Sequence, residues 1–282
     1  TFGTSRMKSL LLGERLGVVA SLDEFREPYF LITDRELAKP ALAEKMVTVS
    51  YEPRLCAGEN EVAFPVFVHP QITTKVKLPP AYQVGETRAA RIFFGGNTEE
   101  GKYDKDVLRK VYHMLTRREM LEAAAAVTPA YRPLDAASWL ASAEFHPFVL
   151  CETQRCKIPQ ERWLEALGKA DFFLACPGVG MPLCHNLIEA LAAGSIPILQ
   201  YAAYLPQPLE DGVNCLAFND AESLRKVIGA ALAMSPENIR IMRANVRHHY
   251  EEFLAPGRFA ISLLTGLSPK AVLLMNSYRV PR

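Results

Sequence analysis

The sequence predicts an α/β protein of two lobes, the first small or truncated and the second a parallel sheet with helices on both faces. From residue 91 onward, short apolar runs alternate with segments whose apolar residues recur at helical spacing. Glycine turns follow two of these apolar runs, while the first ninety residues contain shorter strand-like runs interrupted by proline. The boundary is expected near Gly85, which divides the chain into residues 1–85 and 86–282.

The first lobe is predicted from four short apolar runs, followed by a proline-rich connector at residues 79–87. Its predicted strands are residues 16–20, 29–33, 46–50 and 64–69. In a two-lobed enzyme a catalytic base can come from this lobe across the cleft, from a side chain at a strand end. The candidates at such positions are Asp34, Glu36 and His69.

The second lobe reads as a regular alternation of strands and helices, which predicts parallel strands joined by helical crossovers. In chain order the elements are strand 91–97, helix 103–126, strand 147–151, helix 160–167, strand 172–176, a helix from about residue 182, strand 195–199, a further strand within 209–218, a long helix after it and helix 236–254. The last helix carries a basic face that is expected to be solvated. That face consists of Arg240, Arg243, Arg247 and His248.

The most informative stretch is the glycine turn after strand 172–176. Gly178 and Gly180 end the strand, a helix follows, and Gly194 stands where a left-handed C-terminal residue is expected. Such a turn at the carboxyl ends of parallel strands offers backbone N–H groups and a helix N-terminus to a diphosphate. Glu189, one turn into the helix, can accept hydrogen bonds from two ribose hydroxyls. The alternative is a solvated helix face with Glu189 pointing outward.

The sequence Cys-Pro-Gly-x-Gly, followed by Asn-Leu-Ile-Glu-Ala-Leu-Ala-Ala-Gly-Ser-Ile-Pro-Ile-Leu, resembles the nucleotide-sugar-binding half of GT-B glycosyltransferases, which have two Rossmann-like domains. It is most similar to their exostosin-like group, and residues 209–224 resemble the closing segment of the same domain. The resemblance covers residues 91 to 254. It implies that Glu189 binds the donor ribose and that Gly178 and Gly180 face the diphosphate.

The first apolar strand also ends in a glycine turn, at Gly95, Gly96 and Asn97. In the resembled families this turn faces the cleft between the domains, which makes these residues candidate donor or acceptor contacts. The alternative is a glycine pair that only turns the chain.

The chain departs from the family pattern at two positions. Many relatives have a second glutamate where this chain has Met181, and exostosin-like proteins often have a basic residue where it has Asn186. His185, in the first turn of the helix, can donate to a phosphate oxygen instead, or it can be a structural histidine that caps the turn. Other sources of positive charge are Arg91 and the pair Arg117-Arg118, because arginine holds phosphate bidentately.

Composition excludes several classes of protein. A net charge of +1 over 282 residues argues against nucleic acid as a partner, and no apolar run reaches transmembrane length. The six cysteines lack metal-ligand spacing, so reduced thiols and a cytoplasmic location are expected, with peripheral membrane association left open. A Cys151–Cys156 disulfide in a secretory lumen is the alternative. The chain shows no zinc motif, no Gly-x-Ser-x-Gly and no Walker loop.

The sequence thus predicts a glycosyltransferase that moves a sugar from a nucleotide-sugar to a hydroxyl acceptor such as a glycan. Transfer without a metal or other cofactor is expected, with the departing diphosphate stabilised by the glycine turn and helix terminus. One alternative is a non-catalytic binding or scaffold domain that has kept the transferase fold. A dinucleotide-dependent oxidoreductase is a further alternative, although no Gly-x-Gly-x-x-Gly follows the first strand of the second lobe.

Overall fold

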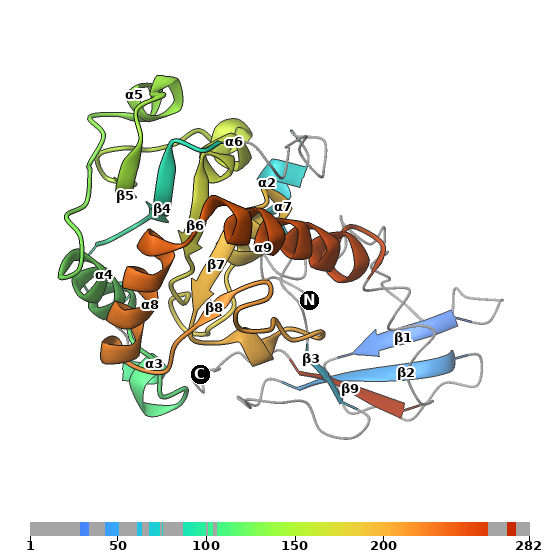
Figure 1. Cartoon of the computed structure of the whole chain (residues 1–282). Helices are drawn as coiled ribbons and strands as arrows, with labels where there is room; N and C mark the ends of the chain where they lie inside the picture. Colours follow the sequence, from blue (N-terminus) through green and yellow to red (C-terminus); the bar gives the residue numbers. More distant parts are fainter. Residues whose placement is uncertain are drawn as a thin grey trace.

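The computed structural model describes residues 29–33, 43–50, 61–63, 68–73, 75, 87–99, 101–103, 106–258 and 270–274. Its elements fall into two parallel sheets, seen in separate halves of the molecule in Figure 1. The strands are β1 (Tyr29–Thr33), β2 (Ala43–Ser50), β3 (Glu61–Ala63), β4 (Ala90–Gly96), β5 (His146–Glu152), β6 (Ala170–Leu174), β7 (Ile196–Leu199), β8 (Leu216–Ala217) and β9 (Lys270–Leu274). The helices are α2 (Pro70–Thr73), α3 (Asp106–Lys110), α4 (Arg117–Ala125), α5 (Ala136–Ala141), η2 (Gln160–Arg162), α6 (Trp163–Gly168), α7 (His185–Ala192), η3 (Ala202–Tyr204), α8 (Ala221–Ala233), α9 (Pro236–His249) and η4 (Tyr250–Leu254).

The second lobe is built on a five-stranded parallel sheet in the order β5-β4-β6-β7-β8. Helices α4 and α8 pack together on one face, and α6, α7 and α9 lie on the other (Figure 1). This arrangement confirms the predicted α/β class, with a parallel sheet covered on both faces. Strands β4 and β6 are neighbours in this sheet. The chain continues from β4 to β5 on one side and from β6 to β7 on the other, so the sheet has a topological switch point between β4 and β6.

The core of this lobe is built from the apolar strands that the sequence predicts. The five phenylalanines of β4, β5 and β6 are each at most 1% exposed. They are Phe93, Phe94, Phe148, Phe172 and Phe173. Full burial of such a side chain contributes about 1.5–3 kcal/mol, and parallel strands covered on both faces have room only for apolar residues.

The prediction of a single helix over residues 103–126 is wrong, because the chain forms two short helices there, α3 and α4. His113 between them adopts φ 53°, a left-handed conformation that ends the first helix. Thr116 then begins the second with a capping box, in which its side chain accepts from the Glu119 backbone and Glu119 accepts from the Thr116 backbone at 2.7 Å. The apolar spacing continued through both helices and did not show this interruption.

Other local predictions are confirmed within a few residues. Gly194 has φ +67°, as expected for a left-handed residue that ends a helix. The helix predicted at 236–254 is α9, whose last turn widens into the π-helical segment η4. Helix α5 was not predicted; Asp135 caps its first turn by accepting from the Ser138 backbone N–H at 2.7 Å.

The first sheet contains β1, β2, β9 and β3 in that order, all parallel. Strands β1 and β2 match two predicted strands, whereas residues 16–20 and 64–67 lie outside the described residues. Strand β9 pairs with both β2 and β3, so residues 270–274 return to the sheet of the first lobe. The boundary near Gly85 had assigned this segment to the second lobe.

A buried ion cluster joins the amino-terminal end of the second sheet to α9. Asp171, 6% exposed, pairs with Arg91 of β4 at 2.6 Å and with Arg243 of α9. Arg243 is 3% exposed, so its predicted place on a solvated basic face is wrong. The carboxylate draws this arginine into the protein, because a buried charge is stable only when it is paired.

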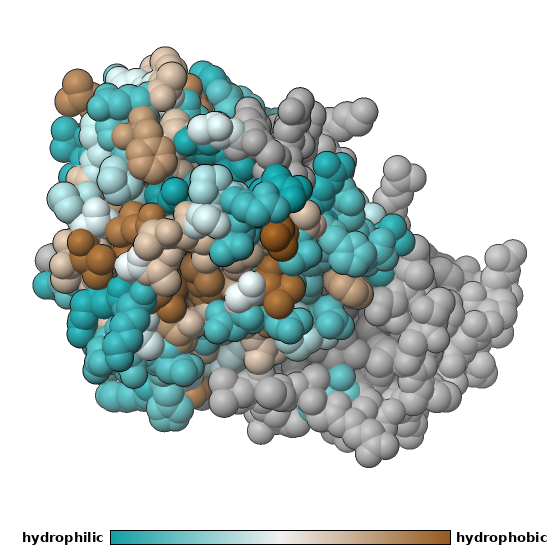
Figure 2. Space-filling view, viewed as in Figure 1, coloured by the Kyte–Doolittle hydropathy of each residue, from teal (hydrophilic) through white to brown (hydrophobic). Residues whose placement is uncertain are grey.

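The face of the second lobe seen in Figure 2 mixes hydrophilic and hydrophobic residues. Among the described residues, no helix combines the length and the apolar character needed to cross a membrane.

Candidate functional site

A cavity of about 270 Å³ opens beside the switch point, where the carboxyl ends of β4 and β5 meet α6 and α7. We call it the switch-point cavity. Open α/β sheets bind ligands at this position because diverging crossovers leave a crevice there. Its lining residues that bear on chemistry are His69, Gly95, Gly96, Trp163, His185, Asn186 and Glu189.

Glu189 is the central carboxylate of this cavity and is only 2% exposed. Its Oε1 accepts the backbone N–H of His69 at 2.9 Å, and its Oε2 accepts the indole N–H of Trp163 at 2.6 Å. Burial raises the pKa of Glu189 to about 7, and the two hydrogen bonds limit that rise. The predicted alternative, a solvated glutamate pointing outward from the helix, is therefore wrong.

Gly95 allows the tryptophan to approach the strand. A Cβ atom at this position would lie 2.7 Å from Trp163 Cη2 and 2.8 Å from Phe93 Cζ, closer than side chains pack. The backbone carbonyl of Gly95 also accepts from Asn186 Nδ2 at 3.4 Å. The glycine thus has a packing role, beyond turning the chain.

The first turn of α7 brings two polar side chains, His185 and Asn186, to the cavity. No side chain caps this helix N-terminus by a hydrogen bond. The imidazole of His185 lies edge-on to that of His69, with 5.0 Å between ring centroids. The turn therefore combines the positive end of a helix dipole with a histidine pair.

Of the three catalytic candidates, His69 is in the described part of the chain, and it lines the cavity. Burial lowers its pKa below the ordinary 6.5, which favours the neutral imidazole near pH 7. Its Nδ1 accepts the backbone N–H of Gln71 at 3.3 Å, and in that tautomer Nε2 carries the proton. His69 in this form is a hydrogen-bond donor instead of a base. Asp34 and Glu36 lie outside the described residues.

Four of the predicted donor contacts are not brought to the cavity. The Gly178 N–H donates to the Met181 carbonyl at 3.1 Å, so it is not an unpaired group as expected, and neither it nor Gly180 lines the cavity. Asn97 instead orders its own loop, accepting from the Glu99 backbone at 2.7 Å. Arg91 lies at the opposite end of β4, in the ion cluster with Asp171.

The other predicted cations also lie elsewhere. Arg117 is buried on the α4 face of the sheet and donates to the carbonyls of Asn97 and Pro177 at 2.7 and 3.2 Å. Arg118 pairs with Glu122 at 2.8 Å on the surface of α4. Arg117 therefore ties together the loops after β4 and β6 without lining the switch-point cavity.

Cys151 and Cys156 also line the cavity, as thiols hydrogen-bonded to one another and not as a disulfide. Burial raises the pKa of both thiols, so neither is an activated nucleophile.

The chain contains one Asp-x-Asp sequence, at residues 104–106. This motif is typical of metal-dependent transferases, and the prediction of metal-free transfer did not take it into account. Asp106 begins α3 and pairs with Lys110 at 2.8 Å, while residues 104 and 105 lie outside the described part. Independence from metal stays a prediction.

Trp163 is the site residue that sequence reasoning missed. It begins α6 and lies 26 positions before Glu189 in the chain. Its indole reaches the Glu189 carboxylate because α6 and α7 pack against each other. No spacing rule links two residues so far apart. An isolated tryptophan at a helix start, which needs a partner for its N–H when buried, was the available signal.

No protein-family model and no curated protein matches this chain. Among solved structures it is similar to WaaG, a glycosyltransferase involved in lipopolysaccharide biosynthesis, with a TM-score of 0.37 and 18% identity over 72% of this chain and 55% of that one. It is also similar to the N-terminal domain of Candida albicans trehalose-6-phosphate phosphatase, with a TM-score of 0.38 and 14% identity over 64% of this chain and 42% of that one. A third similar structure is AviGT4, a glycosyltransferase involved in avilamycin A biosynthesis, with a TM-score of 0.31 and 13% identity over 76% of this chain and 68% of that one. This chain spans about half the length of the first two.

Proposed function

We propose that this chain is a glycosyltransferase of the exostosin-like GT-B type, which binds a nucleotide-sugar donor in the switch-point cavity. The observation that carries the proposal is the buried Glu189 at the carboxyl end of the parallel sheet, held in place by Trp163 and by the His69 backbone. Burying a carboxylate is costly, and carboxylates with perturbed pKa values in clefts are candidates for ligand binding.

The carboxylate retains acceptor capacity for a ribose. An ionised carboxylate has about four acceptor positions, and the protein occupies two of those on Glu189. The remaining two match the vicinal hydroxyls of a ribose. Ribose hydroxyls donate best to the ionised form, so nucleotide affinity should increase as the pH rises through about 7, the pKa of this group.

The diphosphate is proposed to lie between the Gly95-Gly96 turn and the first turn of α7. The uncapped helix N-terminus provides partial positive charge, and His185 and His69 provide N–H donors in place of the arginine or lysine that the family pattern expects at position 186. These donors would stabilise the negative charge that develops on the leaving diphosphate as an acceptor hydroxyl attacks the anomeric carbon. The base that takes the hydroxyl proton is proposed to come from the first lobe, with Asp34 and Glu36 as the candidates.

A second reading is a non-catalytic domain that keeps the transferase fold and partners an active subunit. It is favoured by the 2% exposure of Glu189, whose two oxygens each already have a protein partner, and by the absence of a basic residue at Asn186. In this reading Glu189 joins α2 to α7 and has no ligand.

The test is thermal unfolding with UDP, GDP, CMP, ADP and NAD. A ligand at about one hundred times its dissociation constant stabilises the folded state by about 2.7 kcal/mol. Wild type is compared with Glu189→Gln, which keeps the shape of the side chain, and with Glu222→Gln, an exposed residue of α8 paired with Lys226 at 2.7 Å. We expect one nucleoside phosphate to stabilise wild type and the Glu222 variant but not the Glu189 variant.

Other outcomes distinguish the alternatives. Stabilisation by NAD alone would indicate an oxidoreductase, and no stabilisation by any nucleotide would favour the scaffold reading. If a nucleotide binds, release of the nucleoside diphosphate from its sugar conjugates in the presence of glycan acceptors measures transfer. Binding without any release would again favour the non-catalytic domain.

A further inference from the structure

A second cavity, of about 180 Å³, lies on the other face of the same sheet. Cys151 of β5 lines the switch-point cavity, whereas the residue before it, Leu150, lines this second cavity, because successive strand residues point to opposite faces. We call it the α4 cavity. Its apolar floor consists of Leu121, Ala125, Ala130, Phe148 and Leu150.

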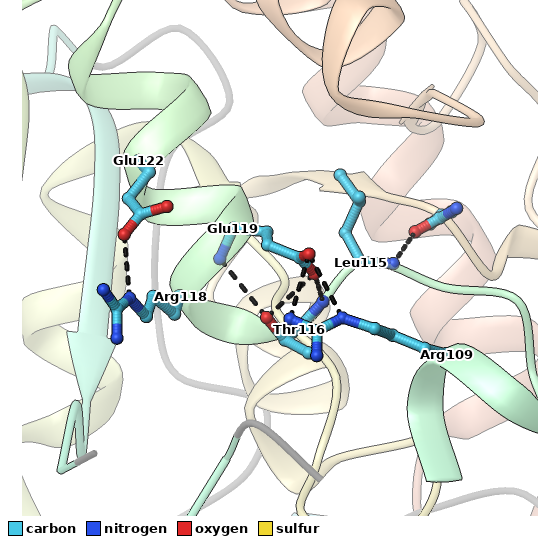
Figure 3. A network of polar contacts seen from close by, with 7 residues as sticks. Arg109, Leu115, Thr116, Arg118, Glu119 and Glu122 are labelled. Atoms are coloured by element: carbon cyan, nitrogen blue, oxygen red, sulfur yellow. Dashed lines mark hydrogen bonds and ion pairs between the residues drawn. The ribbon is translucent and has the colours of Figure 1, made fainter. Parts of the chain in front are cut away.

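The rim of the α4 cavity carries two ion pairs. Arg118 and Glu122 pair along α4 at 2.8 Å, as Figure 3 shows, and their side chains are 59% and 62% exposed. Arg132 pairs with Glu152 at the end of β5, and the hydroxyl of Thr98 donates to the same carboxylate at 3.0 Å. The rim therefore offers both guanidinium donors and carboxylate acceptors beside the apolar floor.

One wall of the cavity is held by several contacts of Arg117. The buried Arg117 guanidinium lies 3.6 Å from the ring centroid of Tyr103, and its two carbonyl contacts hold it to the loops after β4 and β6. Among the described residues no carboxylate pairs with Arg117. Its charge and the stacked ring form a preorganised wall at one side of the floor.

The rim determines which ligand chemistry fits. A purely apolar molecule would shield part of the charged rim from water without offering it hydrogen bonds, and an anion would meet the carboxylates of Glu122 and Glu152 as like charges. A hydroxyl group both donates and accepts, so it can bridge a guanidinium and a carboxylate of the same pair. The C–H faces of a sugar ring would cover the apolar floor. A cavity of about 150 Å³ holds one benzene ring, so the volume of about 180 Å³ is of the order of one sugar ring.

We propose that the α4 cavity is a carbohydrate-binding site, separate from the switch-point cavity, that takes one sugar unit of a glycan. It would hold the glycan on the face of the sheet opposite the proposed donor site. The proposal does not depend on the function proposed above, because the residues of the two cavities do not overlap.

The test is saturation-transfer NMR of the full chain with the methyl glycosides of glucose, galactose, mannose and N-acetylglucosamine, with benzoate as an anionic, apolar probe. Ala125→Trp places an indole over the cavity, and the matched control Ala233→Trp makes the same change at the exposed last residue of α8. Ala125 is itself exposed, so the folded core is not altered. We expect at least one glycoside to bind, with affinity about tenfold or more weaker in Ala125→Trp and unchanged in Ala233→Trp.

Glu189→Gln separates the two sites. Glycoside binding should be the same in this variant as in wild type, because Glu189 is on the other face of the sheet. Loss of binding in Glu189→Gln would assign the sugar to the switch-point cavity and overturn the proposal. Binding of benzoate in preference to every glycoside, or no glycoside signal at all, would also overturn it. A null result with nucleotides would leave this outcome unaffected.

Discussion

Glu189 makes the stability of the protein depend on pH in a way that can be calculated. Its pKa is about 7 in the folded protein and near the ordinary 4.5 when the chain is unfolded. Below pH 4.5 the group is protonated in both states. Between the two values the folded state binds the proton more tightly, so stability falls as the pH rises, and above about 7 the full loss is present. At about 1.4 kcal/mol per pH unit, the difference between the folded and unfolded pKa values corresponds to a loss of about 3 kcal/mol in the free energy of unfolding.

The perturbation is Glu189→Gln, which cannot ionise. The amide has one oxygen acceptor, so one of the two N–H donors, from His69 or from Trp163, then faces an NH₂ group. This lowers the free energy of unfolding by about 1–3 kcal/mol, by an amount that does not vary with pH. The difference in stability between variant and wild type should therefore move by about 3 kcal/mol in favour of the variant between pH 4.5 and 7. His69 titrates in both proteins, so to first order its contribution cancels.

The assay is urea denaturation followed by circular dichroism at half-unit steps from pH 4.5 to 8. The slope m should be equal in both proteins, so that the comparison concerns stability alone. Glu222→Gln serves as the control and should keep the pH dependence of wild type. A difference between Glu189→Gln and wild type that stays constant within about 1 kcal/mol would refute the reasoning, because it would mean that the carboxylate is solvated.

Four further predictions concern the supports of the fold and the site. Asp171→Asn should lower the free energy of unfolding by about 3–5 kcal/mol in urea denaturation, since it leaves two arginines at a buried site without their carboxylate; a loss under 1 kcal/mol would show that the pairs are solvated. Gly95→Ala should cost about 1–3 kcal/mol and change the fluorescence of Trp163, because the new methyl group collides with the indole. Thr116→Ala should lower the melting temperature by an amount equivalent to about 1 kcal/mol, through loss of the capping box, and Thr116→Ser should restore most of it. A chelator such as EDTA should leave any nucleotide-induced thermal shift unchanged, and its abolition would refute metal-free binding.

Residues close together in sequence carried the predictions of local structure that are confirmed. Glu189 and the Gly194 that ends its helix belong to one strand-turn-helix-strand unit, where spacing alone predicts which residues share a face. The parallel five-stranded sheet followed from alternation, because helical crossovers require parallel strands. The interruption at His113 was missed because the apolar period continued across it. Arg243 was misplaced because helical spacing shows which charges share a face but not which of them meets a buried aspartate.

What the sequence determined by itself is the α/β class and the position of Glu189 on the helix after the glycine turn, since each depends on short-range periodicity and on turn chemistry; its role in a binding site stays a prediction. The tertiary structure decided what surrounds that carboxylate. Trp163 and His69 meet Glu189 across 26 and 120 positions of the chain. Strand β9 likewise joins a sheet whose other strands lie more than 200 residues earlier. Such contacts form where closing a long loop is compensated by packing and hydrogen bonding between distant segments, and no local pattern records that balance.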